Sequence, residues 1–161
     1  MEKRKRNRLE DYDYSLYGSY FITICTHNKQ KVLSEFVGER SALPQEEPKL
    51  ILTDVGEIVD KAIQNISTRY EDVQVDKYCI TPNHIHLILT LFTQEDDGSA
   101  MRSPTIPTIV NQMKGFVTKQ IGYSVWQRSY FDHIIRNEKS YQEIWDYIHE
   151  NPIKWENDEY F

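Results

Sequence analysis

The sequence predicts an α+β fold: a ferredoxin-like, RRM-like antiparallel sheet with two helices on one face and an extra C-terminal helix on the other. Four segments have the composition of strands, and two amphipathic segments separate them in the order strand–helix–strand–strand–helix–strand. That order matches the split β-α-β arrangement. A third amphipathic segment follows the last strand. It is an addition to the arrangement and is expected to cover the second face of the sheet.

The size and composition of the chain predict one globular domain. The chain has 161 residues, of which 39% are hydrophobic and 27% are charged. We therefore treat residues 1–161 as a single domain with one core. No apolar run reaches the about 18 residues of a membrane span, and no apolar segment follows the basic N-terminus as in a secretory signal. Cys25 and Cys79 form no CxxC pair, which predicts reduced thiols in a cytoplasmic protein.

The net charge of −6 is unevenly distributed. The first nine residues carry a local charge of +4, which leaves −10 for the rest of the chain. We interpret residues 1–12 as a flexible basic arm that can hold a phosphate backbone. A solvated tail without a function is the alternative interpretation. The basic residues that matter for the first interpretation are Arg4, Lys5, Arg6 and Arg8.

The first strand and the first helix lie in the N-terminal half. YFITICT (20–26) is rich in β-branched and aromatic residues, which favours a strand. A Pro- and Glu-containing stretch, SALPQEEPKL (41–50), follows it. Thr53 and Asp54 can each cap the helix that comes next. Its apolar residues recur at helical spacing: Val55, Ile58, Val59, Ala62, Ile63 and Ile66.

The remaining elements follow in the predicted order. VQVDKYCI (73–80) and HIHLILTLF (84–92) are two strands joined by TPN (81–83), and an acidic loop follows that we expect to be mobile. The second helix comes next and ends near Gly122, and its apolar residues are Ile109, Val110, Met113, Phe116, Val117 and Ile121. SYFDHIIR (129–136) is the fourth strand. The last helix should run from about 137 to 151, where Pro152 discourages its continuation.

Two histidines stand at the head of an otherwise apolar strand. Alternation along the strand puts the side chains of Ile85, Leu87, Leu89 and Leu91 on the face that should seat the first two helices. His84 and His86 therefore share the opposite face, where two imidazoles can bind one metal ion. The alternative is that they are ordinary sheet histidines with polar neighbours.

A metal ion held by two imidazoles needs another ligand. Position 88 is Ile, so the pattern does not continue as HxHxH, which argues against a histidine-triad hydrolase and against a zinc triad on the strand. The third ligand should come from the C-terminal helix. Tyr147 and Asn151 lie four residues apart at the edge of its apolar stripe, which consists of Tyr141, Ile144, Trp145 and Ile148. A boundary tyrosine with a wet hydroxyl, and an Asn before Pro that merely ends the helix, are the alternatives.

These residues carry a resemblance to a known family. GSYFITICTHNKQ, ITPNHIHLIL and the C-terminal block VWQRSYFDHIIRNEKSYQEIWDYIHENPIKW resemble, over nearly the whole chain, the REP-associated tyrosine transposases. These are single-tyrosine, insertion-sequence-type transposases of the HUH nuclease superfamily. The resemblance implies that Tyr147 is the nucleophile and that His84, His86 and Asn151 bind the metal. Related transposases often have Gln at the last of these positions, so Asn151 is a shorter variant.

The resemblance also implies an activity and a substrate. It implies a single-stranded DNA endonuclease and strand transferase that cleaves beside a hairpin through a 5′-phosphotyrosine intermediate, as at bacterial repetitive extragenic palindromes (REP). Such an enzyme would act near the bacterial nucleoid, as a monomer or as a homodimer. The family implies Mg²⁺ or Mn²⁺, and the mixed nitrogen and oxygen ligand set suits Mn²⁺ better than Mg²⁺.

Further residues are candidates for contact with DNA or with the site. Arg4, Lys5, Arg6 and Arg8 are candidates to clamp a hairpin, Lys114 and Lys119 to line a DNA groove, and Arg128 to contact a phosphate. A solvated face or a surface salt bridge is the alternative for the last three. His133, on the fourth strand, is interpreted as a structural residue or as a residue that supports the metal ligands.

Two other classes of protein remain open at this point. A non-catalytic nucleic-acid-binding module on the same sheet would not need His84, His86 or Tyr147. A metal-dependent hydrolase of small phosphoesters would turn over without a covalent adduct between protein and DNA. The four candidate residues occur together on elements that can meet, which favours the transposase.

Overall fold

The computed structural model of the chain describes residues 18–37, 49–92 and 104–155. The predicted basic arm and nearly all of the acidic loop lie outside these residues. The main sheet has four strands in the spatial order β4-β5-β1-β6. β1 pairs antiparallel with β5 and β6, and β4 pairs antiparallel with β5. The strands are β1 (Gly18–Cys25), β4 (Val73–Ile80), β5 (His84–Leu91) and β6 (Phe131–Ile135).

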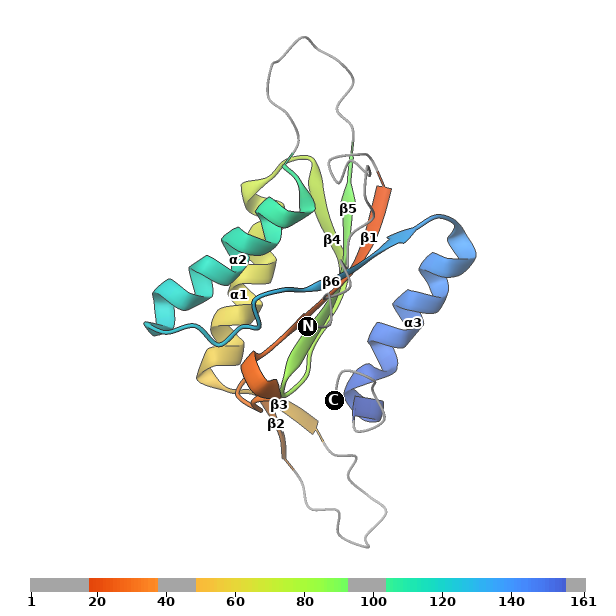
Figure 1. Cartoon of the computed structure of the whole chain (residues 1–161). Coiled ribbons are helices and arrows are strands. Elements are labelled where there is room, and N and C mark those ends of the chain that lie inside the picture. The colour runs from red at the N-terminus through yellow and green to blue at the C-terminus, as the bar shows by residue number, and fades with distance from the viewer. Residues whose placement is uncertain (1–17, 38–48, 93–103, 156–161) are drawn as a thin grey trace, which may run out of the picture.

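The helices lie on both faces of this sheet. α1 (Asp54–Arg69) and α2 (Ile106–Ile121) cover one face, and α3 (Glu138–Lys154) lies across the other (Figure 1). The predicted ferredoxin-like architecture with an extra C-terminal helix is therefore confirmed. The layers matter for function because they separate the face that carries α3 from the face that carries α1 and α2.

Each face of β5 packs as the alternation predicted. Ile85, Leu87 and Leu89 belong to the large core formed with α1 and α2. Ile88 belongs to a smaller cluster under α3, together with Ile148. All eight residues of β5 are buried, so the strand is covered on both faces by packed side chains. Two histidines in such a strand are therefore enclosed by the fold.

The helix ends follow from local sequence. Thr53 caps α1, since its hydroxyl oxygen accepts a hydrogen bond from the backbone N–H of Gly56 at 3.0 Å. Gly122 ends α2 with a left-handed φ of 87°, which glycine adopts without steric cost. The side chain of Asn137 caps α3 by accepting from the N–H of Ser140 at 2.8 Å.

A short hairpin between β1 and α1 was not predicted. β2 (Ser34–Val37) pairs with β3 (Lys49–Leu52) in a separate two-stranded sheet. Thr53, directly after β3, donates its hydroxyl hydrogen to the carbonyl of Val32 at 2.6 Å, which ties the hairpin to the start of α1. The four-residue strands are too short for a clear alternation, so the sequence pattern did not reveal them.

The predicted end of the last helix was wrong. α3 continues through Pro152 to Lys154 instead of stopping at Asn151. Proline cannot donate a backbone hydrogen bond to the carbonyl of Ile148, so the last turn of α3 forms with one helical bond fewer. Trp155, the residue that ends the helix, is buried and donates its indole N–H to Asn83 Oδ1 at 3.1 Å. This tertiary contact explains why the last turn persists beyond the proline.

Candidate active site between the histidine strand and the C-terminal helix

The two histidines of β5 lie side by side on the face covered by α3. Their ring centroids are 4.6 Å apart with an angle of 69° between the planes. Both side chains are 0% exposed. Burial of two imidazoles is costly unless their polar atoms are satisfied, so the surroundings of each ring determine what it can do.

The tautomer of His84 is set by its neighbours. Its Nδ1 lies 2.7 Å from Asn83 Oδ1. The same oxygen accepts the indole N–H of Trp155, which can only donate. Asn83 Oδ1 is thus an acceptor, so Nδ1 of His84 carries the proton and Nε2 carries the lone pair. A neutral imidazole in this tautomer is a metal ligand through Nε2.

His86 is oriented in a similar way. Its Nδ1 lies 2.7 Å from the hydroxyl of Thr23, its neighbour on β1. One side of the ring stacks on Phe21, with centroids 5.3 Å apart and planes 30° apart. Thr23 and Phe21 therefore hold the ring from β1 and leave Nε2 as the second candidate metal-binding atom.

The helix that carries Tyr147 contacts the sheet at two positions along its length. Ile148 is fully buried against the sheet beside Ile88 and Cys79. About two turns earlier in α3, the hydroxyl of Tyr141 donates to Asp76 Oδ2 at 2.8 Å. Asp76 lies where the pairing of β4 with β5 shifts in register, a bulge between Val75 and Lys77.

Tyr141 is a structural anchor. Burial, followed by the hydrogen bond to Asp76 and its negative charge, raises the pKa of Tyr141 to about 12. Asp76 Oδ2 also accepts from Thr90 at 2.6 Å, and the Thr90 hydroxyl lies 2.8 Å from that of Ser19. A phenol held in its protonated form as a donor is a poor nucleophile.

Tyr147 lies beside His86. Its ring centroid is 5.3 Å from that of His86 and 6.1 Å from that of Phe21, which it meets edge to face. The side chain remains 38% exposed. A ligand from solvent can therefore reach a phenol that lies directly against one of the candidate metal-binding imidazoles.

Asn151 lies on the same helix, one turn beyond Tyr147, and is 2% exposed. Its Oδ1 accepts a weak hydrogen bond from Cys79 Sγ at 3.9 Å. Cys79 is the cross-strand partner of His86. The structure thus brings the side chain of Asn151 to the strand position next to His86, with its amide oxygen turned toward the sheet.

The other residues singled out from the sequence lie elsewhere. Lys114 and Lys119 are on α2, and α2 lies on the opposite side of the sheet from α3 (Figure 1). Lys114 Nζ donates to the backbone carbonyl of Gln127 at 2.9 Å, which ties α2 to the segment before β6. Arg128 is exposed in that segment. His133 is exposed on β6, opposite Phe21, and therefore on the face of α3.

Three residues that support the site were not identified from the sequence. Thr23 and Asn83 orient the histidines, and Trp155 fixes the acceptor role of Asn83. Asn83 directly precedes the histidine pair, and this adjacency was the available signal. Thr23 and Trp155 are far from the pair in sequence, so only the register of the sheet and the path of α3 reveal them.

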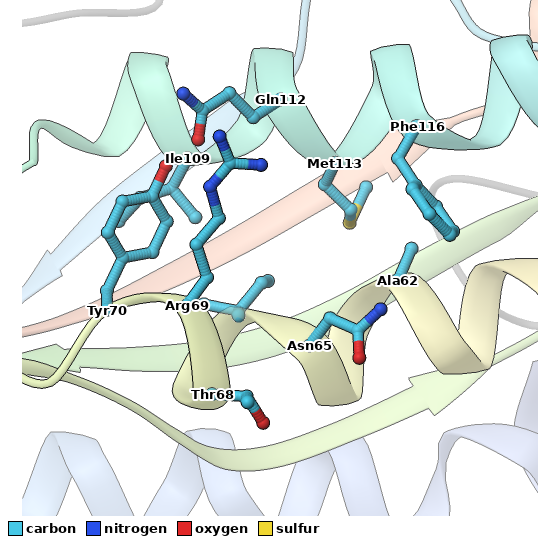
Figure 2. Close-up of a pocket in the computed structure, with 10 residues that line it drawn as sticks. Ala62, Asn65, Thr68, Arg69, Tyr70, Ile109, Gln112, Met113 and Phe116 are labelled. Carbon is cyan, nitrogen blue, oxygen red and sulfur yellow. The ribbon is translucent and has the colours of Figure 1, made fainter.

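A separate hollow lies between α1 and α2, on the face away from the histidines. It has a volume of about 300 Å³ and a largely apolar lining that includes Ala62, Met113 and Phe116, with Arg69, Tyr70 and Gln112 at one end (Figure 2). It contains none of the residues predicted to act on DNA. Among the described residues, no group of three or more His, Cys, Asp or Glu side chains is placed to hold a metal ion.

A four-stranded ferredoxin-like sheet with a histidine pair under a tyrosine-bearing helix defines the class of single-tyrosine transposases. The comparison with known proteins supports this class directly. Residues 19–151 match the family described as transposase IS200 like, and the chain belongs to that family. It is therefore an enzyme of DNA transposition, and its resemblance to the REP-associated tyrosine transposases is confirmed.

Individual relatives agree with the family. A Haemophilus influenzae protein of unassigned function is 34% identical, with 98% of this chain and 93% of the relative covered. A REP-associated tyrosine transposase of Escherichia coli is 30% identical, with 85% and 67% covered. A solved REP-associated tyrosine transposase bound to a REP hairpin is similar with a TM-score of 0.61 and 25% identity, covering 92% of this chain and 74% of that one.

No helix within the described residues is both long enough and apolar enough to cross a bilayer.

Proposed function

We propose that the chain is a metal-dependent enzyme that nicks and rejoins single-stranded DNA beside a hairpin, with Tyr147 as the nucleophile. The observation that carries the proposal is the position of Tyr147, whose ring lies 5.3 Å from that of His86 while its side chain stays 38% exposed. The phenol is open to a DNA strand and next to the residues best suited to bind a cation.

The ligand set supports a metal ion at this place. In both His84 and His86, Nδ1 contacts a neighbouring side chain. Nε2 of each ring points away from that neighbour and can donate its lone pair to a metal ion. Asn151 adds an amide oxygen from α3. Two nitrogens and one oxygen suit Mn²⁺, and Mg²⁺ is the alternative that the family implies. When bound, the metal would polarise and position the scissile phosphate.

The chemistry assigned to the chain is an in-line transfer. The Tyr147 oxygen attacks phosphorus and loses its proton to water, which can reach this 38% exposed residue. The bond from phosphorus to the 3′-oxygen breaks, and that oxygen takes up a proton to leave as a 3′-hydroxyl. The 5′-phosphotyrosine keeps the energy of the broken bond, so a 3′-hydroxyl can later attack it and restore the phosphodiester without ATP.

The proposed substrate is single-stranded DNA with a REP-type hairpin. Support comes from the solved relative, which is bound to a REP hairpin, and from the similar Escherichia coli transposase. Single strands suit the site because their phosphates are reachable and their bases can be turned outward. Arg4, Lys5, Arg6, Arg8, Lys119 and Arg128 remain candidates for backbone contacts, and a location near the bacterial nucleoid goes with this substrate.

A covalent-adduct assay tests the proposal. Labelled hairpin DNAs with single-stranded flanks are mixed with the protein and Mn²⁺ or Mg²⁺, denatured, and examined for a protein band of higher mass. Wild type and Tyr141→Phe should form the adduct, and Tyr147→Phe and His84→Ala should not. Tight hairpin binding without any adduct would favour the binding module, and phosphoester turnover without an adduct would favour a hydrolase.

A further inference from the structure

A groove with exposed aromatic rings lies directly beside Tyr147. It runs between β1, β6 and the first half of α3 and has a volume of about 390 Å³. This is within the about 300–1,000 Å³ of sites that hold small organic groups. On the side of the sheet that carries α3, the groove is lined by the strand residues Phe21, Thr23, Phe131 and His133 and by the helix residues Ser140 and Ile144.

We infer that this groove binds a nucleobase next to the scissile phosphate, with the ring of Phe131 as the stacking platform. The inference rests on the proposed function, because it assigns a DNA base to a groove that adjoins the tyrosine. It adds a positioning and selectivity determinant on an edge strand that carries neither the nucleophile nor a metal ligand.

The groove is continuous with the candidate active site through two residues. Phe21 lines the groove, and its ring also stacks on His86 and meets the ring of Tyr147. Thr23 lines the groove, and its hydroxyl contacts His86 Nδ1. A DNA strand whose phosphate reaches Tyr147 can therefore place an adjacent base at the mouth of the groove.

The register of β6 explains why aromatic rings gather here. Phe131 is paired with Thr23, and His133 with Phe21, so both side chains project from the face that carries α3. β6 is one of the two edge strands of the main sheet. Phe131 is 39% exposed there, so part of a large apolar ring faces solvent beside the candidate active site.

The chemistry of the lining favours a base over a phosphate. Among the described residues, the side chains on this face offer aromatic and apolar surface, two hydroxyls and the imidazole of His133, but no Lys or Arg. Asp132 also lines the groove, but it pairs with the core residue Ile22, so the pleat directs its side chain to the opposite face. An uncharged aromatic surface stacks any base, whereas a phosphate needs cations.

Fluorescence of 2-aminopurine, which stacking quenches, tests the inference. The base analogue is placed at one position at a time along the single-stranded flanks of hairpin DNAs, and fluorescence and adduct formation are followed with each protein. Phe131→Leu removes the ring but keeps an apolar side chain, and Phe131→Trp keeps a stacking surface. Phe116→Leu is the matched control, because Phe116 is 37% exposed on α2, on the far face of the sheet.

We expect wild type to quench the analogue at a position flanking the cleaved phosphate. Phe131→Leu should lose this quenching and lower kcat/KM about tenfold. Phe131→Trp and Phe116→Leu should behave as wild type, and thermal unfolding of all variants should match. Equal quenching and kcat/KM in Phe131→Leu and wild type, or no quenching at any position, would overturn the inference even if the adduct forms. Quenching that depends on Phe131 without any adduct would support the groove and reject the proposed function.

Discussion

The indole N–H of Trp155 donates to Asn83 Oδ1 at 3.1 Å, and this bond links the end of the C-terminal helix to the strand that carries the histidines. The same oxygen lies 2.7 Å from Nδ1 of His84. Trp155, at the end of α3, thereby helps to determine which nitrogen of the buried His84 ring is available to a metal ion.

The first prediction concerns this link. Asn83→Leu removes the acceptor that fixes His84, so Mn²⁺ affinity should fall by about 10–100-fold, as for other residues that orient metal ligands. Trp155→Phe keeps the ring and removes the donor, so its effect should be smaller and in the same direction. Titration calorimetry with Mn²⁺ measures both. Asn65→Leu, an exposed change on α1, is the control, and equal Mn²⁺ affinities in Asn65→Leu and Asn83→Leu would contradict the prediction.

The second prediction concerns metal binding and stability. Because the proposed ligands come from both β5 and α3, Mn²⁺ should stabilise the folded state by about 2.7 kcal/mol when its concentration is 100 times its Kd. Thermal unfolding with and without EDTA should therefore show a higher Tm with Mn²⁺ for wild type. His84→Ala and Asn151→Leu should show no such rise. A Tm that responds to Mn²⁺ equally in wild type and His84→Ala would place the ion elsewhere.

The third prediction concerns the anchor between Tyr141 and Asp76. Its phenol donates to a carboxylate oxygen at 2.8 Å, so Tyr141→Phe should lower the free energy of unfolding by about 1–2 kcal/mol. Covalent-adduct formation should persist, since Tyr141 is an anchor. Urea unfolding measures the first effect, and Tyr123→Phe, at a 58% exposed tyrosine, is the control. Loss of the adduct in a folded Tyr141→Phe variant would argue against this role.

The fourth prediction is the pH dependence of the same contact. The pKa of Tyr141 is raised from its ordinary value near 10 to about 12 in the folded protein. The folded state therefore holds this proton more tightly than the unfolded state, so the stabilisation is fully present below pH about 10 and is lost as the pH rises to about 12. Wild type should lose more stability over this interval than Tyr141→Phe does. Parallel pH profiles of the two proteins would show that the phenol does not titrate as described.

The fifth prediction concerns the close approach of the hairpin to α1. A Cβ at Gly56 would lie 1.9 Å from the carbonyl oxygen of Leu33, which is backbone and cannot rotate away. Gly56→Ala should therefore cost about 1–3 kcal/mol of stability. Gly115→Ala is the matched control, because a Cβ there meets nothing within 4 Å and Ala should stabilise α2 by about 0.5–1 kcal/mol. Equal unfolding midpoints for the two variants would contradict the account of this contact.

The main sheet and its three helices could be predicted because their signals are local. The alternation in β5 assigned each side chain of that strand to a face, and Gly122 marked the end of α2. The β2–β3 hairpin was missed because four-residue strands are stabilised by contacts with α1 and not by a pattern of their own. The extension of α3 past Pro152 depends on Trp155, whose partner Asn83 lies 72 residues away in the sequence.

The candidate site divides in the same way. Residue types and spacing marked His84 and His86, and the resemblance to the family assigned the roles of Tyr147 and Asn151. The groove beside them was not predicted, because it depends on the pairing of β1 with β6, which brings Phe131 opposite Thr23. Such cross-strand neighbours are set by register, and register follows from the fold as a whole.

Identification of the amino acid that bears DNA after cleavage tests the central claim most directly. The adduct formed with a hairpin DNA and Mn²⁺ is digested with nuclease and protease, and the peptide that carries the remaining nucleotide is sequenced by mass spectrometry. The account predicts a single modified peptide with the phosphate on the Tyr147 oxygen. A phosphate on Tyr141 or on any other residue would contradict it.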